Sequence, residues 1–248
     1  MFDLDKKDWK TKMENITQKN KQPITSCTVG KNQMCCFETL CEEEMALIEE
    51  NSVDIIYQKG ETICKQGAFA SHVMVVEEGL AKIFLESNEE ILILKILPAV
   101  NIIGLTSLIE GNNTFQYSAT AYMKTSVKLI EINTFKELIK NNGQFAAKII
   151  SLIAESTVVT YGRFFCLTKK HTYGRMADVL LCLSRRVYKK GHFPLQLSRK
   201  ELAELSSMCV ESIARILTKF KEDKVIEINQ DSIEILDFER LDMISRNG

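Results

Sequence analysis

Several patterns that carry chemistry are missing from this 248-residue sequence. It has no phosphate-cradling glycine-rich loop, no nucleophile elbow and no paired-histidine metal motif. Its three histidines, His72, His171 and His192, are scattered, as structural or solvent-facing histidines are. Because no nucleophile–base pair or metal triad is present either, the sequence predicts a protein that is not an enzyme.

Signals for membranes and secretion are also missing. No unbroken apolar run reaches the ~18 residues of a membrane span, and the N-terminus is charged rather than signal-like. Eight cysteines in such a chain indicate reduced thiols rather than a disulfide framework. We therefore expect a cytoplasmic protein without a membrane partner.

The overall net charge of −1 hides two oppositely charged parts. Residues 163–224 contain fourteen Lys/Arg and six Asp/Glu, which gives a net charge of +8. Residues 36–110 contain four Lys/Arg and fourteen Asp/Glu, which gives a net charge of −10. A basic C-terminal part is typical of a surface that meets nucleic-acid phosphates.

The most informative stretch begins at Ser198, which forms a capping box with Glu201 and so predicts the start of a helix. After an interruption at Ser206 and Ser207, a second helix is predicted from about Val210, with apolar residues at helical spacing. Two short helices, a tight turn and the small Ala203 at their crossing predict a helix-turn-helix. The inward-facing residues would be Leu202, Ala203, Leu205, Ile213, Ile216, Leu217 and Phe220.

Glu211 and Arg215 lie four residues apart and share one face of this second helix. Glutamate accepts from the cytosine amino group and arginine forks onto guanine, and a good bidentate contact discriminates by about 1–3 kcal/mol. The alternative is a surface ion pair worth a few tenths of a kcal/mol. The basic surroundings favour the reading of DNA bases.

Residues 1–35 form a polar leader, and Cys27, Cys35, Cys36 and Cys41 lie within or just after it. Clustered cysteines are typical of a redox switch, an iron–sulfur cluster or another metal site, but this spacing fits no zinc template. The alternative is a segment that merely tolerates cysteine.

Residues 36–143 have the texture of an antiparallel β-roll or jelly roll, with short β-branched runs broken by glycines and a hairpin tip at Ser87 to Glu90. We interpret them as a sensor domain. The apolar interior is either filled core or room for a small apolar ligand; it would comprise Ile91, Leu92, Leu94, Ile103, Leu105 and Tyr117.

Residues 144–168 are predicted to form one long helix with two adjacent apolar seams. One face packs on the roll, and the second needs another partner, most simply the same helix of a second subunit. A broad face buried within one domain is the alternative. The expected dimer contacts are Ile150, Ala154, Thr157, Tyr161 and Phe164.

Residues 169–248 complete the chain, beginning with a hinge near Thr168 to His171. Two short strands flanking a turn at residues 229–232 follow the helix-turn-helix and make it winged. The expected fold class is thus α+β: an N-terminal β-roll, a long dimerisation helix and a C-terminal winged helix-turn-helix.

This order of elements resembles the CRP/FNR superfamily of bacterial transcription regulators over about residues 36–236. The resemblance is carried by Lys59-Gly60-Glu61, Gln66-Gly67, Glu78-Gly79-Leu80, Pro98 with Gly104, Gly174-Arg175-Met176-Ala177, Leu197-Ser198-Arg199-Lys200-Glu201-Leu202-Ala203, and Glu211 with Arg215. It implies a homodimer that binds a palindromic operator in double-stranded DNA and contacts RNA polymerase.

The resemblance also assigns contacts on the DNA. Val210 stands where some members have an arginine, and with Glu211 and Arg215 it would face bases, touching a thymine methyl group. Phosphate contacts would come from Ser198, Arg199, Lys200, Ser212 and Lys219.

The sensor part departs from the family. Members that bind cyclic AMP have Gly-Glu where this chain has Gly104-Leu105, and Arg-Ser where it has Tyr117-Ser118. The phosphate of cyclic AMP would therefore lack the arginine that is its bidentate partner in those members. We therefore expect an effector other than cyclic AMP.

The cysteines depart from the family as well. Cys27 and Cys36 match two positions of the oxygen-sensing FNR type, but Gly30 and Ile130 occupy the other two. No cofactor is expected. A redox or gas sensor that uses iron–sulfur, thiol or haem chemistry is the alternative.

Overall fold

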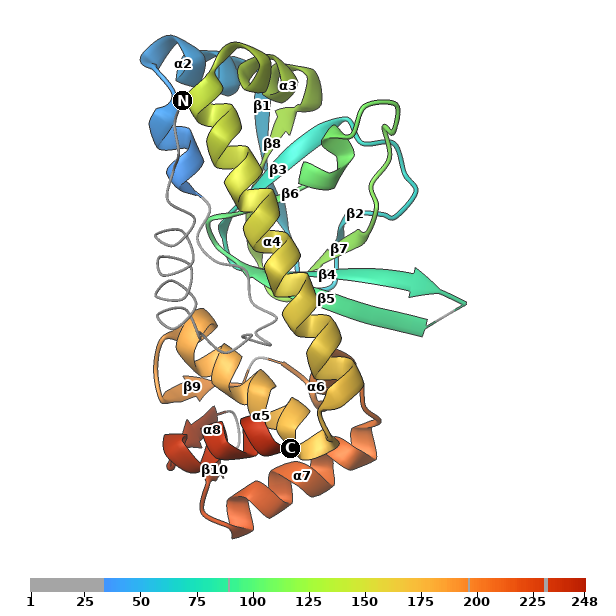
Figure 1. The fold of residues 1–248 in the computed structure, drawn as a ribbon, viewed down its shortest axis with the longest axis vertical. Coiled ribbons are helices and arrows are strands. Elements are labelled where there is room, and N and C mark those ends of the chain that lie inside the picture. Colours follow the sequence, from blue (N-terminus) through green and yellow to red (C-terminus); the bar gives the residue numbers. More distant parts are fainter. Residues whose placement is uncertain (1–33, 89, 196, 230–231) are drawn as a thin grey trace, which may run out of the picture.

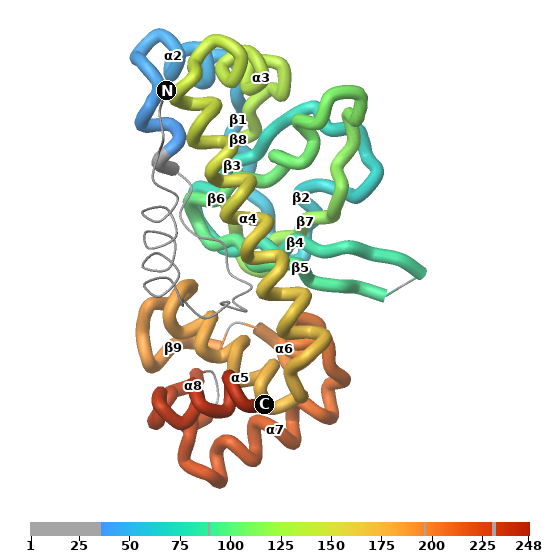
Figure 2. Tube along the Cα trace, viewed as in Figure 1, coloured from blue at the N-terminus to red at the C-terminus, as the bar shows by residue number. Residues whose placement is uncertain are grey.

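The computed structural model describes residues 34–248 except 89, 196 and 230–231, so Cys27 lies outside the described residues. A long helix, α4, runs along the molecule and joins a β-sheet part at one end to a mostly helical part at the other (Figure 1). The Cα trace follows the same path, and the C-terminus lies in the helical part (Figure 2). The expected α+β architecture is confirmed.

Two four-stranded antiparallel sheets form the roll, in the strand orders β1-β8-β3-β6 and β2-β7-β4-β5. A 3-10 helix, Met34–Thr39, and α2, Glu42–Glu50, precede them. The strands are β1 Ser52–Tyr57, β2 Thr62–Cys64, β3 His72–Glu78, β4 Leu80–Ser87, β5 Glu90–Pro98, β6 Asn101–Ile103, β7 Ser118–Ala121 and β8 Thr125–Glu131, with a 3-10 helix at Leu105–Leu108.

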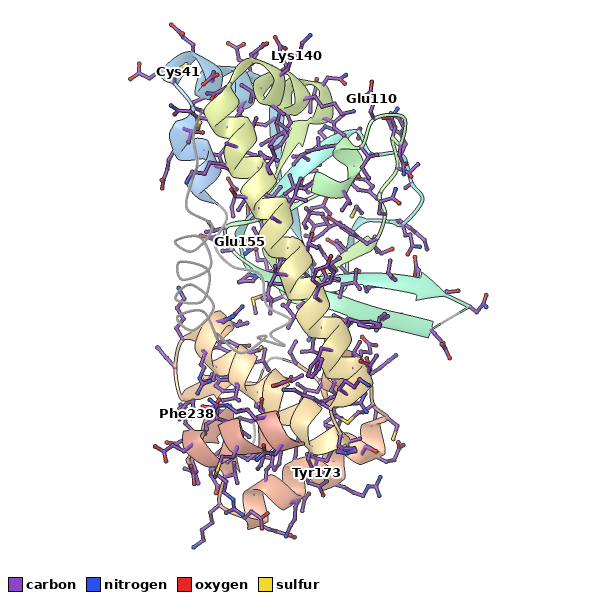
Figure 3. The ribbon with its side chains drawn as sticks, viewed as in Figure 1. Cys41, Glu110, Lys140, Glu155, Tyr173 and Phe238 are labelled. Carbon is purple, nitrogen blue, oxygen red and sulfur yellow. The ribbon has the colours of Figure 1, made fainter. Side chains whose placement is uncertain are left out.

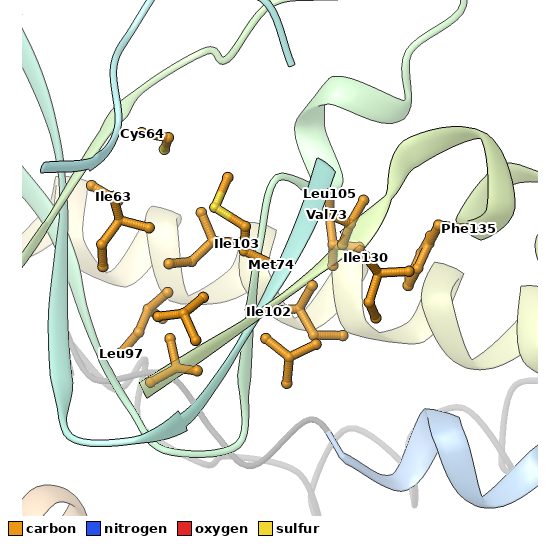
Figure 4. Packing of buried hydrophobic residues seen from close by; sticks show 14 of the residues in the cluster. Ile63, Cys64, Val73, Met74, Leu97, Ile102, Ile103, Leu105, Ile130 and Phe135 are labelled. Carbon is orange, nitrogen blue, oxygen red and sulfur yellow. The ribbon is translucent and has the colours of Figure 1, made fainter. Parts of the chain in front are cut away.

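The roll is filled by apolar side chains from both sheets (Figure 4). Ile103 is fully buried, and Leu105 and Tyr117 are less than a tenth exposed. These three side chains belong to a filled core, which was one of the two interpretations of the roll interior. Ile91 and Leu92 do not, because they are 40% and 39% exposed. They lie near the tip of the β4–β5 hairpin, which extends away from the body of the roll (Figure 1).

Helix α3, Ile132–Asn141, leads into α4, Gly143–Lys169, through Asn142. The Asn142 side chain caps α4 by accepting from the amides of Gln144 and Phe145, each at 3.0 Å. At 1.5 Å per residue the 27 residues of α4 span about 40 Å. The helix buries one stripe at spacings of three, four and seven, which includes Phe145, Ile149, Leu152, Val159, Arg163 and Cys166.

By length and composition α4 is also apolar enough to cross a membrane, with a mean hydropathy of 1.3 in its most apolar window. An apolar run of ~18 residues, as sought in the sequence, does not occur in α4 because Lys148, Glu155 and Arg163 interrupt it. One such helix is weak evidence for a membrane span, since core helices pass the same test. Phe145, Ile149 and Leu152 pack in the core of the roll.

The C-terminal part begins with α5, Thr172–Cys182, which continues into a π-helical turn at Leu183–Tyr188. The helix-turn-helix pair is α6, Arg199–Ser206, and α7, Val210–Glu222. A three-stranded antiparallel sheet, in the order β10-β11-β9, forms the wing. Its strands are β9 His192–Pro194, β10 Ile226–Asn229 and β11 Ser232–Ile235, and α8, Phe238–Asn247, ends the fold.

Gly79, between β3 and β4, tests how tightly the roll is built. Its φ is +95°, and a Cβ there would lie 2.6 Å from the carbonyl oxygen of Lys124. Gly60 has a similar φ of +88° but open space around it. We expect Gly79→Ala to lower the free energy of unfolding by about 3–5 kcal/mol, from backbone strain plus overpacking.

The matched variant Gly60→Ala carries only the backbone strain, so we expect about 1–2 kcal/mol. Urea unfolding followed by circular dichroism measures both losses. Equal losses for the two variants would contradict the packing assigned to Gly79.

Candidate nucleic-acid interface

Helix α6 starts with the predicted capping box. The Ser198 hydroxyl accepts from the Glu201 amide at 3.2 Å, and the Ser198 amide donates to the Glu201 carboxylate at 2.7 Å. These two bonds satisfy amides that the first turn of a helix leaves without partners. Leu202, Ala203 and Leu205 are buried as predicted.

The turn between α6 and α7 is built on Ser207, which adopts a left-handed conformation with φ 51° and ψ 56°. Glycine is the usual residue for such a turn, so serine here carries some backbone strain. The Met208 amide then donates to the Ala203 carbonyl at 2.9 Å and closes the turn. Cys209 follows as the N-cap of α7, and its side chain caps no backbone amide.

Helix α7 separates a buried side from an exposed one. Ile213, Ile216, Leu217 and Phe220 are buried at the predicted spacing. Val210, 40% exposed, lies on the outer surface with the exposed Glu211 and Arg215. The structure therefore brings the three residues predicted to face DNA bases to one end of one exposed helix surface.

The alternative interpretation of Glu211 and Arg215, an i,i+4 ion pair, is not seen among the salt bridges of the described residues. Arg215 instead donates through Nη2 to the Ser212 hydroxyl at 3.2 Å, and the Cys209 thiol lies 3.1 Å from the same oxygen. The pKa of Glu211 is lowered by its own backbone amide at the helix start, by Cys209 and by the nearby Arg215. An ionised Glu211 is ready to accept a hydrogen bond from a base.

The residues predicted to contact phosphates lie around this surface. Ser198, Arg199 and Lys200 are exposed at the start of α6, and Ser212 is half-buried on α7. Lys219, near the far end of α7, pairs with Asp223 at 3.1 Å, which raises its pKa. A phosphate near Lys219 would have to compete with that carboxylate.

The predicted dimer residues lie on the side of α4 that faces away from the roll. Ile150, Tyr161 and Phe164 are 67%, 66% and 69% exposed, and Ala154 and Thr157 are exposed between them. We call these five residues the exposed α4 stripe. Large apolar side chains in such a row are typical of a surface that another protein covers.

The residues at the positions where the resemblance puts the phosphate contacts of a cyclic nucleotide bond to other parts of the chain. Gly104, at φ +98°, donates its amide to the Tyr117 hydroxyl at 2.8 Å. Burial raises the pKa of Tyr117 to about 12. Ser118 is also buried, and its hydroxyl donates to Glu86 at 3.0 Å.

The cysteines form no ligand set within the described residues. Cys36 is buried, whereas Cys41 is exposed and lies at the end of the molecule opposite Tyr173 and Phe238 of the helix-turn-helix part (Figure 3). Cys35 follows Met34 in the first 3-10 helix, and Cys27 lies outside the described residues. A redox role for the four cysteines therefore stays a prediction.

The contacts that two arginines make with the turn were not predicted from the sequence. Arg175 of α5 donates through Nη1 to the Ser207 carbonyl at 3.0 Å, and Arg163 of α4 places Nη2 3.5 Å from the Ser207 hydroxyl. Arg163 entered the sequence analysis only as a positive charge. Arg163 follows Ser156 by seven residues and Val159 by four, so it shares their face of α4. That spacing was the sequence signal that could have placed its side chain in the buried stripe.

Comparison with known proteins finds two family models in the chain. A Crp-like helix-turn-helix domain matches residues 174–244. A cyclic nucleotide-binding domain matches residues 55–142. The two models cover the helix-turn-helix part and the β-roll separately.

Related proteins match across both parts. The transcriptional activator protein anr of Pseudomonas aeruginosa is 27% identical over 216 residues, which cover 82% of this chain and 87% of that protein. The structure of FixK2 from Bradyrhizobium japonicum aligns with a TM-score of 0.71 at 21% identity, over 78% of this chain and 96% of that one. A putative transcriptional regulator of the crp/fnr family from Eubacterium rectale aligns with a TM-score of 0.70 at 19% identity, over 85% of this chain and 97% of that one.

Isothermal titration calorimetry with cyclic AMP tests the filled phosphate position. We expect no binding, because the amide of Gly104 already has an acceptor and no arginine stands at Tyr117 to pair with a phosphate. Saturable binding at micromolar nucleotide would show that Tyr117 moves aside, and would contradict this interpretation of the roll.

Proposed function

The chain belongs to the CRP/FNR family of transcription regulators, and we propose that it works as a homodimer whose two α7 helices bind the half-sites of a palindromic operator. It is a DNA-binding transcription regulator and not an enzyme. The single observation that carries the proposal is the exposed surface of α7, where Val210, Glu211 and Arg215 lie together.

The proposed base contacts follow from the chemistry of these side chains. Arg215 would fork onto the two major-groove acceptors of guanine, while Glu211 would accept from cytosine N4. Val210 adds an apolar contact to a thymine methyl group. Ser198, Arg199, Lys200, Ser212 and Lys219 would meet phosphates and fix the register of the protein on DNA.

Homodimerisation is supported by the exposed α4 stripe, because burying its aromatic and aliphatic side chains needs a large complementary surface. A second copy of the same helix offers one, and pairing two copies about a two-fold axis matches a palindrome. We propose a cytoplasmic protein that also contacts RNA polymerase, and one similar protein carries the name "transcriptional activator".

The effector is proposed to be a signal other than cyclic AMP, since the phosphate position of the roll is filled by Tyr117. A signal received in the roll or on α4 would shift the protein between two arrangements of its DNA-binding parts. The connection at Lys170 and His171, between α4 and α5, is the proposed hinge.

Arg215→Ala tests base reading on an operator first obtained by selection from random duplexes. We expect the preference for a G·C pair at the contacted position to fall by about 1–3 kcal/mol, while weaker, salt-sensitive binding remains. Fluorescence anisotropy with matched and substituted duplexes measures the change.

The control for Arg215→Ala is Lys200→Ala, which should weaken binding to all sequences alike and lower the salt slope by about one ion. If Arg215→Ala binds the same site with unchanged affinity, the role given to Arg215 is wrong.

Phe164→Glu tests the dimer, because it places a charge in the exposed α4 stripe where the second subunit would bury it. We expect sedimentation to show a monomer that retains its secondary structure. Ser151→Glu is the control, since Ser151 is exposed on α4 outside this stripe and the dimer should persist. A dimer that survives Phe164→Glu would place the interface elsewhere.

A further inference from the structure

The roll and the helix-turn-helix part share one continuous apolar core. Leu80, Phe84 and Tyr122 of the roll belong to the same buried cluster as Leu202 and Leu205 of α6. Strand β5 and α6 are in contact at this point. The position of α6 is therefore set against the base of the β4–β5 hairpin and not by its chain connections alone.

An ion pair spans this contact. Lys82 of β4 donates to the Glu204 carboxylate of α6 at 2.8 Å, and the two side chains are only 12% and 19% exposed. The ammonium also lies 5.3 Å from the ring centre of Phe84 and 5.4 Å from that of Tyr122. A pair so shielded from water depends on its geometry, because a displaced partner leaves a charge without compensation.

Arg163 ties a third element to the same place. This side chain of α4 is 3% exposed, and its Nε donates to the carbonyl of Ile93 in β5 at 3.1 Å. The same guanidinium places Nη2 3.5 Å from Ser207, in the turn that leads into α7. Arg163 therefore links the hairpin, the long helix and the turn before the DNA-reading helix.

The covalent connection is short and does not fix the orientation by itself. Only Lys170 and His171 separate α4 from α5, and Lys170 is extended, with φ −87° and ψ 141°. Rotation about these two residues would swing α7 relative to α4. The contacts around Lys82, Glu204 and Arg163 oppose that rotation.

We propose that Lys82, Glu204 and Arg163 are positioning residues that set which half-site spacing the dimer accepts. This inference rests on the proposed function, because it concerns two DNA-reading helices held at a fixed separation. Two-headed binding to a palindrome requires the heads to match the distance between half-sites. Binding to one isolated half-site does not.

Charge reversal across the ion pair tests the inference. Lys82→Glu and Glu204→Lys each replace an attraction by a repulsion, and the double variant restores it. Each protein is titrated with an isolated half-site, with the selected palindrome, and with palindromes whose half-sites are moved by two base pairs. The ratio between palindromes cancels any general effect of the added charge on DNA affinity.

For each single reversal we expect the preference for the selected spacing to fall about tenfold, with half-site affinity kept within about twofold. The double variant should regain most of the preference. Lys65→Glu is the matched control, because Lys65 pairs within the roll with Glu86 at 3.5 Å, and its spacing preference should stay that of the wild type. Arg163→Lys, which retains the charge but loses the Nε donor, should lower the preference too.

Two results separate the inference from its premise. If the wild-type protein selects no duplex, the proposed function fails and the inference with it. If wild-type selectivity is intact but the single reversals keep their spacing preference, or the double variant does not regain it, only the inference is overturned. Glu204→Gln, a milder change that leaves no repulsion, serves if a reversal variant does not fold and should lower the preference in the same direction.

Discussion

Helix α4 is apolar around more of its circumference than the β-roll covers. Phe145, Ile149 and Leu152 bury one side in the core of the roll, while the exposed α4 stripe faces away from it. The hydrophobic effect acts on both sides alike, so the helix that completes one subunit also favours joining two. The same helix carries Arg163 to the turn of the helix-turn-helix, and the roll, the proposed dimer surface and the helix-turn-helix part thus share a single helix.

The surface that we propose to read DNA rests on several local contacts that hold α6 and α7 in place. The capping box fixes the start of α6, the left-handed Ser207 fixes the turn, and four buried side chains fix the rotation of α7 about its own axis. Arg215 donates a hydrogen bond to the Ser212 hydroxyl and forms no ion pair with Glu211. Such preorganisation lowers the entropy lost on binding and so favours affinity, whereas discrimination between base pairs would come from the side chains that contact base edges.

Features written in local sequence were predictable, and features made by distant segments were not. The Ser198 capping box, the buried spacing of α7 and the hairpin tip near Ser87 follow from patterns a few residues long. The missing phosphate partners at Leu105 and Tyr117 were visible in sequence, but not that the Tyr117 hydroxyl bonds Gly104. Strand alternation did not show that the β4–β5 hairpin outgrows its sheet and exposes Ile91 and Leu92. The pairing of Lys82 with Glu204 joins residues 122 positions apart and left no local trace.

The bond between Tyr117 and Gly104 has a consequence for any ligand that would enter the roll at this place. The Gly104 amide already donates to the Tyr117 hydroxyl, so an incoming anionic group would have to displace this intramolecular bond before it could accept from the same amide. A ligand that bound at this amide would gain only the difference between its own bond and the one it displaced.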